Sequence, residues 1–230
     1  MYVPVYYVLL QNKKESTYRY ALQACISASE GRMQATTYTS DFEQAILSTM
    51  KAEFPTGVAV GCLFHWKQAI RRKLVDFHIP KDLISELIGT NGVMNILTAI
   101  PIEEIIPKGI PYCRRGFDES RYQDKFNAFW DYFVRTWMIR YNPRVIPLFL
   151  RMLNLLVNRA NNPLERFNRK MNESFPTPHA PMSRFVETIR KISEEYVSDL
   201  GRIQKGTMAK PVHLPVTVYE IPESYTNFEP

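Results

Sequence analysis

The sequence has few of the residues that mark secreted, membrane-spanning or zinc-binding proteins. Its three cysteines in 230 residues are an odd number at irregular spacing. This argues against a disulfide framework and favours a reducing compartment. No apolar run is long enough to cross a bilayer, so we expect no membrane partner. The first ten residues, MYVPVYYVLL, lack the basic lead-in and the small-residue cleavage site of a signal peptide.

Metal-ligand patterns of the zinc type are equally sparse. Cys62 and His65 have a C-x-x-H spacing, but a structural zinc site needs about four nitrogen or sulfur ligands. The sequence has no C-x-x-C or H-x-x-x-H motif to complete such a site, and no DNA-recognition zinc finger is visible. This argues against zinc, although a small zinc module built on the two residues is one alternative interpretation.

The composition is that of a folded, basic protein. Apolar residues make up 45% of the chain, which suits a packed core. The formal net charge of +6 favours an anionic partner such as nucleic acid.

The first 75 residues alternate between strand and helix patterns. We expect strands near 2–10, 35–39 and 58–64, the first at a sheet edge because Pro4 cannot donate to a ladder. Helices are expected over 15–30, after a capping box at Ser40–Glu43, and from His65 onward. This order predicts parallel strands joined by helical crossovers, an α/β layer.

Strand patterns vanish after residue 80. Helices are expected over 81–99, 117–138, 148–158, 164–175 and 181–200, with a loop over 100–116 and an extended tail from 207. An aromatic stripe at helical spacing predicts packed core; it consists of Tyr122, Phe126, Phe129, Trp130, Phe133 and Trp137. We therefore divide the chain into residues 1–78, an all-α insertion over 79–160, C-terminal helices over 161–206, and a tail over 207–230.

Two carboxylates are candidates for chemistry. Asp41 stands where a strand ends and a helix begins, which is where parallel sheets gather functional residues. Glu165 lies early in a helix among amides and cations. Each also has a purely structural interpretation, because Asp41 suits a helix cap and Glu165 a helix N-terminus.

Taken together, the order of these short motifs resembles the transposases of Mutator-like elements (MULE transposases). The resemblance runs from about residue 2 to 195. The matching motifs are PVYYVLL at 4–10, Thr39-Ser40-Asp41-Phe42-Glu43-Gln44-Ala45, Phe54-Pro55, Gly61-Cys62-Leu63-Phe64-His65, Gln68-Ala69, Arg72-Lys73, Arg135-Thr136-Trp137 and Asn161-Asn162-x-x-Glu165.

The resemblance implies an RNase H-like α/β core, here incomplete, followed by a mostly helical insertion and C-terminal helices. It also implies a DDE site of two Asp and one Glu that holds two Mg²⁺ or Mn²⁺ ions for phosphoryl transfer. Asp41 matches the second Asp and Glu165 the Glu, both as catalytic and metal-binding residues. Cys62 and His65 match the C-x-x-H motif beside that site. The cations expected to contact DNA are Lys67, Arg71, Arg72, Lys73, Arg166, Arg169 and Lys170.

The implied partner is transposon terminal-repeat DNA in the nucleus, and assembly into a homo-oligomer stays open. The first catalytic Asp belongs on a strand upstream of residues 2–10, so we expect a fragment that does not cut DNA by itself and whose sheet lacks central strands. The alternative is a non-catalytic DNA-binding protein derived from a transposase, whose affinity falls steeply with salt.

Overall fold

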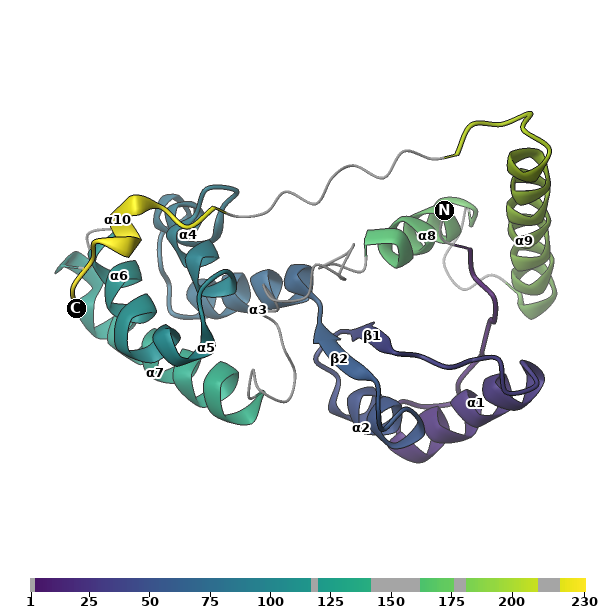
Figure 1. Ribbon diagram of the computed structural model, residues 1–230, viewed down its shortest axis with the longest axis horizontal. Coiled ribbons are helices and arrows are strands. Elements are labelled where there is room, and N and C mark those ends of the chain that lie inside the picture. The colour runs from purple at the N-terminus through teal and green to yellow at the C-terminus, as the bar shows by residue number, and fades with distance from the viewer. Residues whose placement is uncertain (1–2, 117–119, 142–161, 176–180, 211–219) are drawn as a thin grey trace. The chain divides into compact units, whose positions relative to one another are not determined.

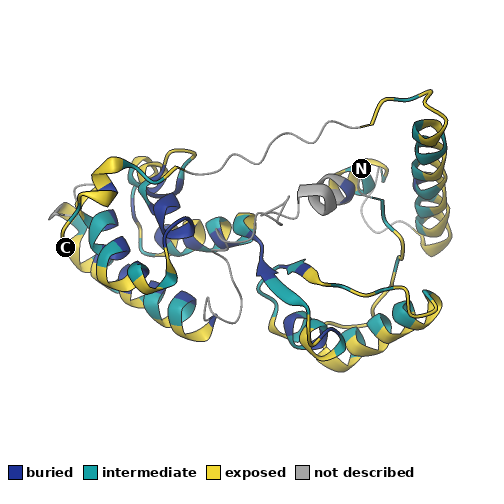
Figure 2. Ribbon diagram, in the orientation of Figure 1, coloured by how far each residue is buried: buried dark blue, intermediate teal, exposed yellow. Residues whose placement is uncertain are grey.

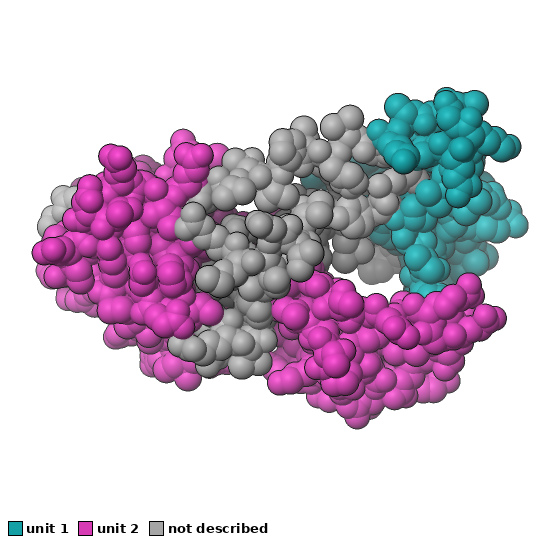
Figure 3. Space-filling model, viewed as in Figure 1, with its two compact units in different colours: residues 1–11, 161–216 teal, residues 12–160, 217–230 magenta. Residues whose placement is uncertain are grey.

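The computed structural model describes residues 3–116, 120–141, 162–175, 181–210 and 220–230 (Figure 1). The chain divides into two compact units (Figure 3). The larger unit comprises residues 12–160 and 217–230, and the smaller unit comprises residues 1–11 and 161–216. The described residues are mostly helical with one small parallel sheet, which is compatible with the predicted α/β class.

The larger unit begins with a compact α/β segment. Its elements are helix α1 (Glu15–Ala28), strand β1 (Thr37–Ser40), helix α2 (Gln44–Glu53), strand β2 (Val58–Gly61) and helix α3 (Leu63–Asp76). The two strands pair in parallel, from Thr37 opposite Val58 to Ser40 opposite Gly61. Helix α2 is their crossover and packs against α1 (Figure 1). It ends before Pro55, because a residue that precedes proline disfavours the helical conformation.

The predicted strand near residues 2–10 is wrong over the described part, since residues 3–10 form no strand. A strand needs a ladder partner, and Pro4 cannot donate to one. Val5 and Leu9 are instead 76% and 61% exposed. Tyr7 contacts two residues of its own unit: its ring lies 5.7 Å from that of Phe167, and its hydroxyl accepts a hydrogen bond from Ser193 Oγ at 3.1 Å.

The boundaries of the other two strands also differ from those expected. Strand β2 ends at Gly61, because the backbone turns at Cys62, the N-cap of α3, and the helix begins at Leu63. The predicted capping box does not form, since α2 begins only at Gln44 and its N-cap, Glu43, makes no side-chain cap hydrogen bond. The Asp41 carboxylate instead accepts the backbone N–H of Glu43 at 3.3 Å and closes the turn between β1 and α2.

The next segment is more helical than the sequence predicts. Helix α4 (Lys81–Ile88) and a 3₁₀ helix (Val93–Thr98) lead into a continuous helical stretch. That stretch comprises α5 (Ile102–Glu104), a π-helical turn (Ile105–Gly109) and α6 (Ile110–Arg115), so the expected loop over 100–116 is wrong. Pro101 is the N-cap of α5 and Pro111 lies in the first turn of α6, positions that tolerate a missing N–H.

The aromatic stripe lies on helix α7 (Gln123–Phe133) and on the π-helical continuation Val134–Arg140, after a 3₁₀ turn at Ser120–Tyr122. Phe126, Phe129, Trp130, Phe133 and Trp137 are all at most 3% exposed. Figure 2 colours the buried residues of the chain dark blue. They join the buried side chains of α3 in one core, where the Trp66 ring meets Phe133 at 6.4 Å and Trp137 at 6.3 Å. The prediction of a packed core is confirmed.

The smaller unit contains helix α8 (Asn162–Glu173) and helix α9 (Met182–Gln204). Phe167 of α8 lies 6.4 Å from Tyr196 of α9, ring to ring. The described C-terminal residues, 220–230, belong to the larger unit and include a short helix, α10 (Glu223–Thr226), so the prediction of an extended tail is wrong there. Residues 211–219 of the predicted tail lie outside the described residues. The helix expected over 148–158 lies outside the described residues, and the four-part division of the chain stays a prediction.

Among the described residues, no single helix has the length and apolar character to cross a membrane. Two helical segments, Lys81–Thr98 and Ile102–Arg115, satisfy those two criteria only when they are taken together, and the chain bends by 106° between them.

Candidate functional site

Two loops that leave the sheet carry the predicted site residues. Asp41 follows β1 and Cys62 follows β2, and the pairing of Ser40 with Gly61 places both at the carboxyl end of the sheet. His65 lies in the first turn of α3, directly beyond Cys62. The N-terminal end of a 14-residue helix carries partial positive charge and unpaired backbone N–H groups. The α3 end of this region is therefore suited to an anion.

A pocket of about 410 Å³ opens at this end of the sheet. Asp41 and His65, which the sequence analysis selected separately, both line it. The wall opposite them comes from α7 and its π-helical continuation. The other lining residues are Phe42, Glu43, Ala69, Arg72, Tyr132, Thr136, Trp137, Arg140 and Tyr141.

The two pocket carboxylates are held differently. Glu43 accepts a hydrogen bond from the Tyr18 hydroxyl at 2.9 Å and an ion pair from Lys13 at 3.5 Å. Burial raises the pKa of Tyr18, and its bond to Glu43 raises it further. Glu43 is thus tied to the α1 side of the fold. Within the described part of the chain, the Asp41 carboxylate accepts a single hydrogen bond, which comes from the backbone N–H of Glu43.

The pocket also contains two cations and one buried polar nitrogen. Arg72 and Arg140 are exposed at its rim. His65 Nδ1 is buried and has no hydrogen-bond partner within the described parts of the chain. Because a buried polar atom is rarely left unpaired in a native protein, this nitrogen is an unusual feature of the pocket wall.

Aromatic packing fixes the Asp41 loop to the helical wall. The Phe42 ring makes edge contacts with Trp137 at 4.9 Å and with Tyr141 at 5.3 Å. Tyr141 stacks on Trp137 at 5.4 Å, and its hydroxyl donates to the Phe42 carbonyl at 3.0 Å. These contacts connect residues 99 positions apart in the sequence. They hold the carboxylate side of the pocket against the side that carries Arg140.

The predicted basic face of α3 is divided by the structure. His65, Ala69 and Arg72 stand at positions i, i+4 and i+7 of α3, and all three line the pocket. Lys73 lies 4.7 Å above the Phe77 ring and 5.2 Å above that of Tyr132. The remaining two, Lys67 and Arg71, are spaced i, i+4 and do not line the pocket.

Burial acts on two titratable groups near this helix. It lowers the pKa of Lys67, which lies half-buried. Burial also raises the pKa of Tyr132; hydrogen bonding to its side chain opposes that rise, and the positive charge of Arg72 opposes it to a smaller extent. The influence of Arg72 on Tyr132 agrees with the place of both side chains in the pocket lining.

Of the remaining predicted residues, Cys62 does not line this pocket, and those from Glu165 to Lys170 belong to the smaller unit. Cys62 is 0% exposed and is the N-cap of α3. Glu165 and Arg166 lie on α8, where their side chains are outside the description. Arg169 is exposed. Lys170 donates to Glu195 Oε2 at 2.6 Å, a bond that raises the pKa of Lys170.

Sequence reasoning missed the residues of the opposite wall. Tyr132, Thr136 and Arg140 follow a regular spacing of four and lie beside the buried aromatic stripe. The signal was therefore a second face on the same helix, polar and aromatic rather than fully apolar. This second face was overlooked because the buried aromatic stripe was by itself enough to explain the helix as part of the core.

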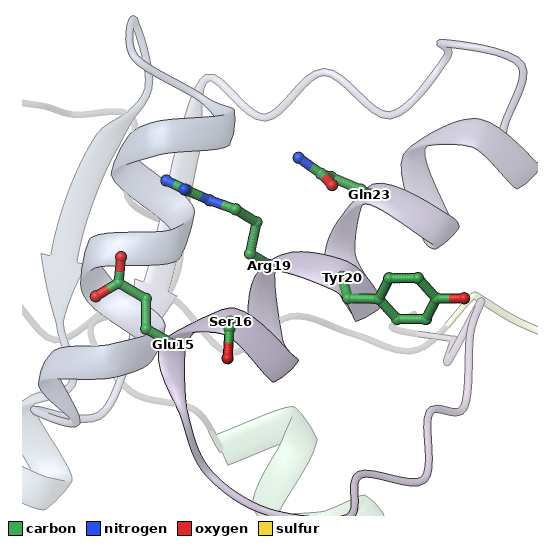
Figure 4. Close-up of a pocket in the computed structure, with 5 residues that line it drawn as sticks. All are labelled: Glu15, Ser16, Arg19, Tyr20 and Gln23. Atoms are coloured by element: carbon green, nitrogen blue, oxygen red, sulfur yellow. The ribbon is translucent and has the colours of Figure 1, made fainter.

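A second hollow lies along α1 and has a structural explanation. Figure 4 shows its lining residues, which are Glu15, Ser16, Arg19, Tyr20 and Gln23. Gln23 donates to Glu53 of α2 at 2.9 Å, and Arg19 pairs with the same carboxylate at 3.5 Å. These polar contacts join α1 to α2, so Arg19 and Gln23 already have a structural role.

Within the described residues, no group of three or more His, Cys, Asp or Glu side chains could hold a metal ion. The pocket brings Asp41, Glu43 and His65 to its lining, but Glu43 is already engaged by Tyr18 and Lys13. A magnesium centre takes about six oxygen ligands, and the donors of this pocket do not amount to one.

Comparisons with known proteins identify part of the chain. Residues 1–69 match the family model of the MULE transposase domain. No curated protein and no solved structure matches the chain. The matched segment contains Asp41, Cys62 and His65, whereas Glu165 and the helical wall of the pocket lie outside it. Over residues 1–69 the chain is thus similar to the MULE transposase domain, and this match supports its resemblance to a fragment of that family.

Proposed function

We propose that this transposase-derived protein binds the DNA backbone at the pocket between the sheet end and the aromatic helix. The proposal rests on one observation above all. Asp41 and His65, from loops after two different strands, line one pocket together with Arg72 and Arg140. The family match supports DNA as the anion in question. By the family resemblance, the DNA is terminal-repeat DNA and the compartment is the nucleus.

The chemistry of the lining suits a phosphodiester. Arginine offers planar donors that match phosphate oxygens, and Arg72 and Arg140 are both exposed at the rim. The N-terminal end of α3 adds partial positive charge. His65 lines the same pocket. Tyr132 and Tyr141 supply aromatic surface against which a sugar or base packs.

Asp41 is the residue for which a metal role is proposed. A lone carboxylate repels a phosphate unless a cation lies between them. We propose, on the resemblance, that Asp41 and Glu165 are ligands of Mg²⁺ or Mn²⁺ in an RNase H-like DDE arrangement. The described donors do not by themselves fit such a centre, so no reaction step is derived through it.

We further propose that these 230 residues bind DNA without cleaving it. The resemblance requires three catalytic carboxylates, and the sequence matches only two of them, Asp41 and Glu165. The alternative function, a non-catalytic DNA-binding protein derived from a transposase, shares the same pocket. It differs only in whether a longer protein that contains these residues cleaves DNA.

Binding is tested by fluorescence anisotropy with a labelled 30-base-pair duplex. We expect the double substitution Arg72→Gln and Arg140→Gln to weaken binding at least about tenfold, since each lost charge removes one phosphate contact. The matched control is the double substitution Arg71→Gln and Arg135→Gln, which also removes two exposed arginines, one from α3 and one from the π-helical continuation of α7, neither of which lines the pocket. Equal losses in the two proteins would contradict the proposal, because they would place binding outside the pocket.

Cleavage is tested separately by incubating the native chain with supercoiled DNA in Mg²⁺ and in Mn²⁺. We expect no nicking above that of the Asp41→Asn chain. Metal-dependent nicking that Asp41→Asn abolishes would overturn the non-cleaving proposal while leaving DNA binding intact.

A further inference from the structure

A second constellation of charged and aromatic side chains lies away from the pocket, where the C-terminal tail (residues 220–230) meets the α5–α6 stretch. Four side chains of that stretch contact the tail and follow a helical spacing of four, four and three. We call them the tail-binding face; they are Glu104, Lys108, Tyr112 and Arg115. Figure 1 shows the tail, with α10, lying beside α6.

Tyr225 anchors the tail. It is 3% exposed and belongs to the same buried core as the aromatic helix. Its hydroxyl donates to Glu104 Oε2 at 2.8 Å, and its ring makes an edge contact with Tyr112 at 5.1 Å. The Lys108 ammonium lies 4.7 Å above the ring and also donates to the Thr226 carbonyl at 3.3 Å.

The residues that flank Tyr225 repeat this mode of contact. Phe228 lies 5.4 Å from the Tyr112 ring and 4.9 Å from the Arg115 guanidinium. Arg115 also donates to the Glu229 carbonyl at 3.4 Å, and the Tyr112 hydroxyl bonds Ser224 Oγ at 2.8 Å. On the tail, Phe228 thus lies three residues after Tyr225 and four after Ser224. These residues contact Tyr112 and Arg115, which are three residues apart on the α5–α6 stretch.

The two partners differ in charge. The tail sequence EIPESYTNFEP carries Glu220, Glu223 and Glu229 and no basic residue. The tail-binding face has two cations, Lys108 and Arg115, which contact carbonyls and rings of the tail, and one carboxylate, Glu104. A short segment with an aromatic anchor, a second aromatic residue and acidic flanks has the features of a peptide ligand that a helical face recognises.

We propose that the tail-binding face is a docking site that also accepts the C-terminal tail of a second copy of this chain. The tail belongs to the larger unit, whereas the residues just before it, up to 216, belong to the smaller one. The sequence between Gln204 and Glu220 has a maximum reach of about 55 Å, since an extended residue spans about 3.3–3.6 Å. Exchange of an identical segment between two copies reproduces every contact described above.

The first test uses a fluorescein-labelled peptide of residues 220–230 and full-length chains. A native chain supplies its own tail at an effective concentration in the millimolar range, which competes with the free peptide. We expect the Tyr225→Ala chain to bind the peptide at least about tenfold more tightly than the native chain. A peptide with Tyr225→Ala is expected not to bind. Failure of the peptide to bind any folded chain, or equal binding to both, would overturn the proposal.

A second variant covers the case in which the Tyr225→Ala chain does not fold. Phe228 is only half-buried, so Phe228→Ala weakens the tail without opening the core. Circular dichroism establishes that each chain is folded before binding is measured.

The second test examines exchange between whole chains. One chain carries Tyr225→Ala, which damages the tail, and the other carries Lys108→Glu and Arg115→Glu, which damage the face. We expect each chain alone to be monomeric by light scattering and the mixture to form a heterodimer above the peptide Kd. A mixture that stays monomeric at ten times that Kd would refute exchange in trans.

Discussion

Phe42 connects the candidate site to the core, and its removal gives the sharpest prediction about stability. Its ring lies between the Asp41 loop and the helical wall, with Trp137 at 4.9 Å and Tyr141 at 5.3 Å. The Tyr141 hydroxyl adds a hydrogen bond to the Phe42 carbonyl at 3.0 Å. The substitution Phe42→Ala removes both ring contacts, whereas Tyr141→Phe removes only that hydrogen bond.

The expected cost follows from burial. Truncation of a fully buried phenylalanine costs about 3–5 kcal/mol. Phe42 is only half-buried, so we expect about half of that, roughly 2 kcal/mol, in the free energy of unfolding. One neutral hydrogen bond contributes about 1 kcal/mol, which is the expected cost of Tyr141→Phe. Because the two substitutions act on one contact, their effects should be non-additive.

Urea unfolding followed by tryptophan fluorescence measures these costs, since Trp137 and Trp66 lie in the affected core. Exposed Phe64 offers a control, because Phe64→Ala removes a phenylalanine that is 44% exposed. We expect the control to cost less than Phe42→Ala. A cost below about 0.5 kcal/mol for Phe42→Ala, or a larger cost for the control, would refute this account of the packing.

Four further results are expected. Glu30→Gly should raise the melting temperature, because Glu30 has φ 54° at a helix end, and a non-glycine residue there costs about 1–2 kcal/mol. Gly206→Ala, at φ 72°, should lower it, and equal melting temperatures would contradict this reasoning. Ellman's reagent should modify only Cys25 in the native protein, because the other two cysteines are 0% exposed; three reactive thiols before unfolding would contradict the core. Burial and Glu104 raise the pKa of Tyr225 in the folded state, so the protein should lose stability as pH rises above about 10, and Tyr225→Phe should weaken that loss when urea midpoints at pH 9 and 11 are compared.

The elements that the sequence predicts well are those with strong local signals. The aromatic spacing identified the core helix, and the alternation of strand and helix identified β1, α2, β2 and α3. The segment at residues 3–10 was predicted as a strand from its valines and tyrosines. Strand formation depends on a partner elsewhere in the chain, and composition does not reveal whether that partner exists.

Proline misled the prediction in the opposite direction. Residues 100–116 contain Pro101, Pro107 and Pro111, which suggested a loop. Pro101 precedes the first turn of the stretch, and Pro107 and Pro111 lie within and just after the π-helical turn, where the regular α-helical hydrogen-bond pattern changes. Tertiary packing also contributes, since Gly109 lies so close to Ile100 and Leu97 that a Cβ would fall 2.6 Å and 2.8 Å from their side chains.

The candidate site was half predictable. Asp41 and His65 stand at strand ends, and their positions follow from the topology. Arg140 and Tyr141 come from a helix that reaches the pocket through packing of Phe42 on Trp137 and Tyr141. A local sequence pattern does not reveal the contact between Phe42 and Tyr141, which are 99 positions apart. The division of the basic face of α3, with Arg72 in the pocket and Arg71 outside it, likewise depends on the orientation of the helix.

Ultraviolet crosslinking of the native chain to bromodeoxyuridine-substituted duplex DNA, with crosslinked peptides located by mass spectrometry, tests the central claim most directly. The account predicts crosslinks at the aromatic and histidine side chains of the pocket, His65, Tyr132 and Tyr141. These crosslinks should disappear in the Arg72→Gln, Arg140→Gln chain. Crosslinks confined to α9, or crosslinks that persist undiminished in that chain, would contradict DNA binding at this pocket.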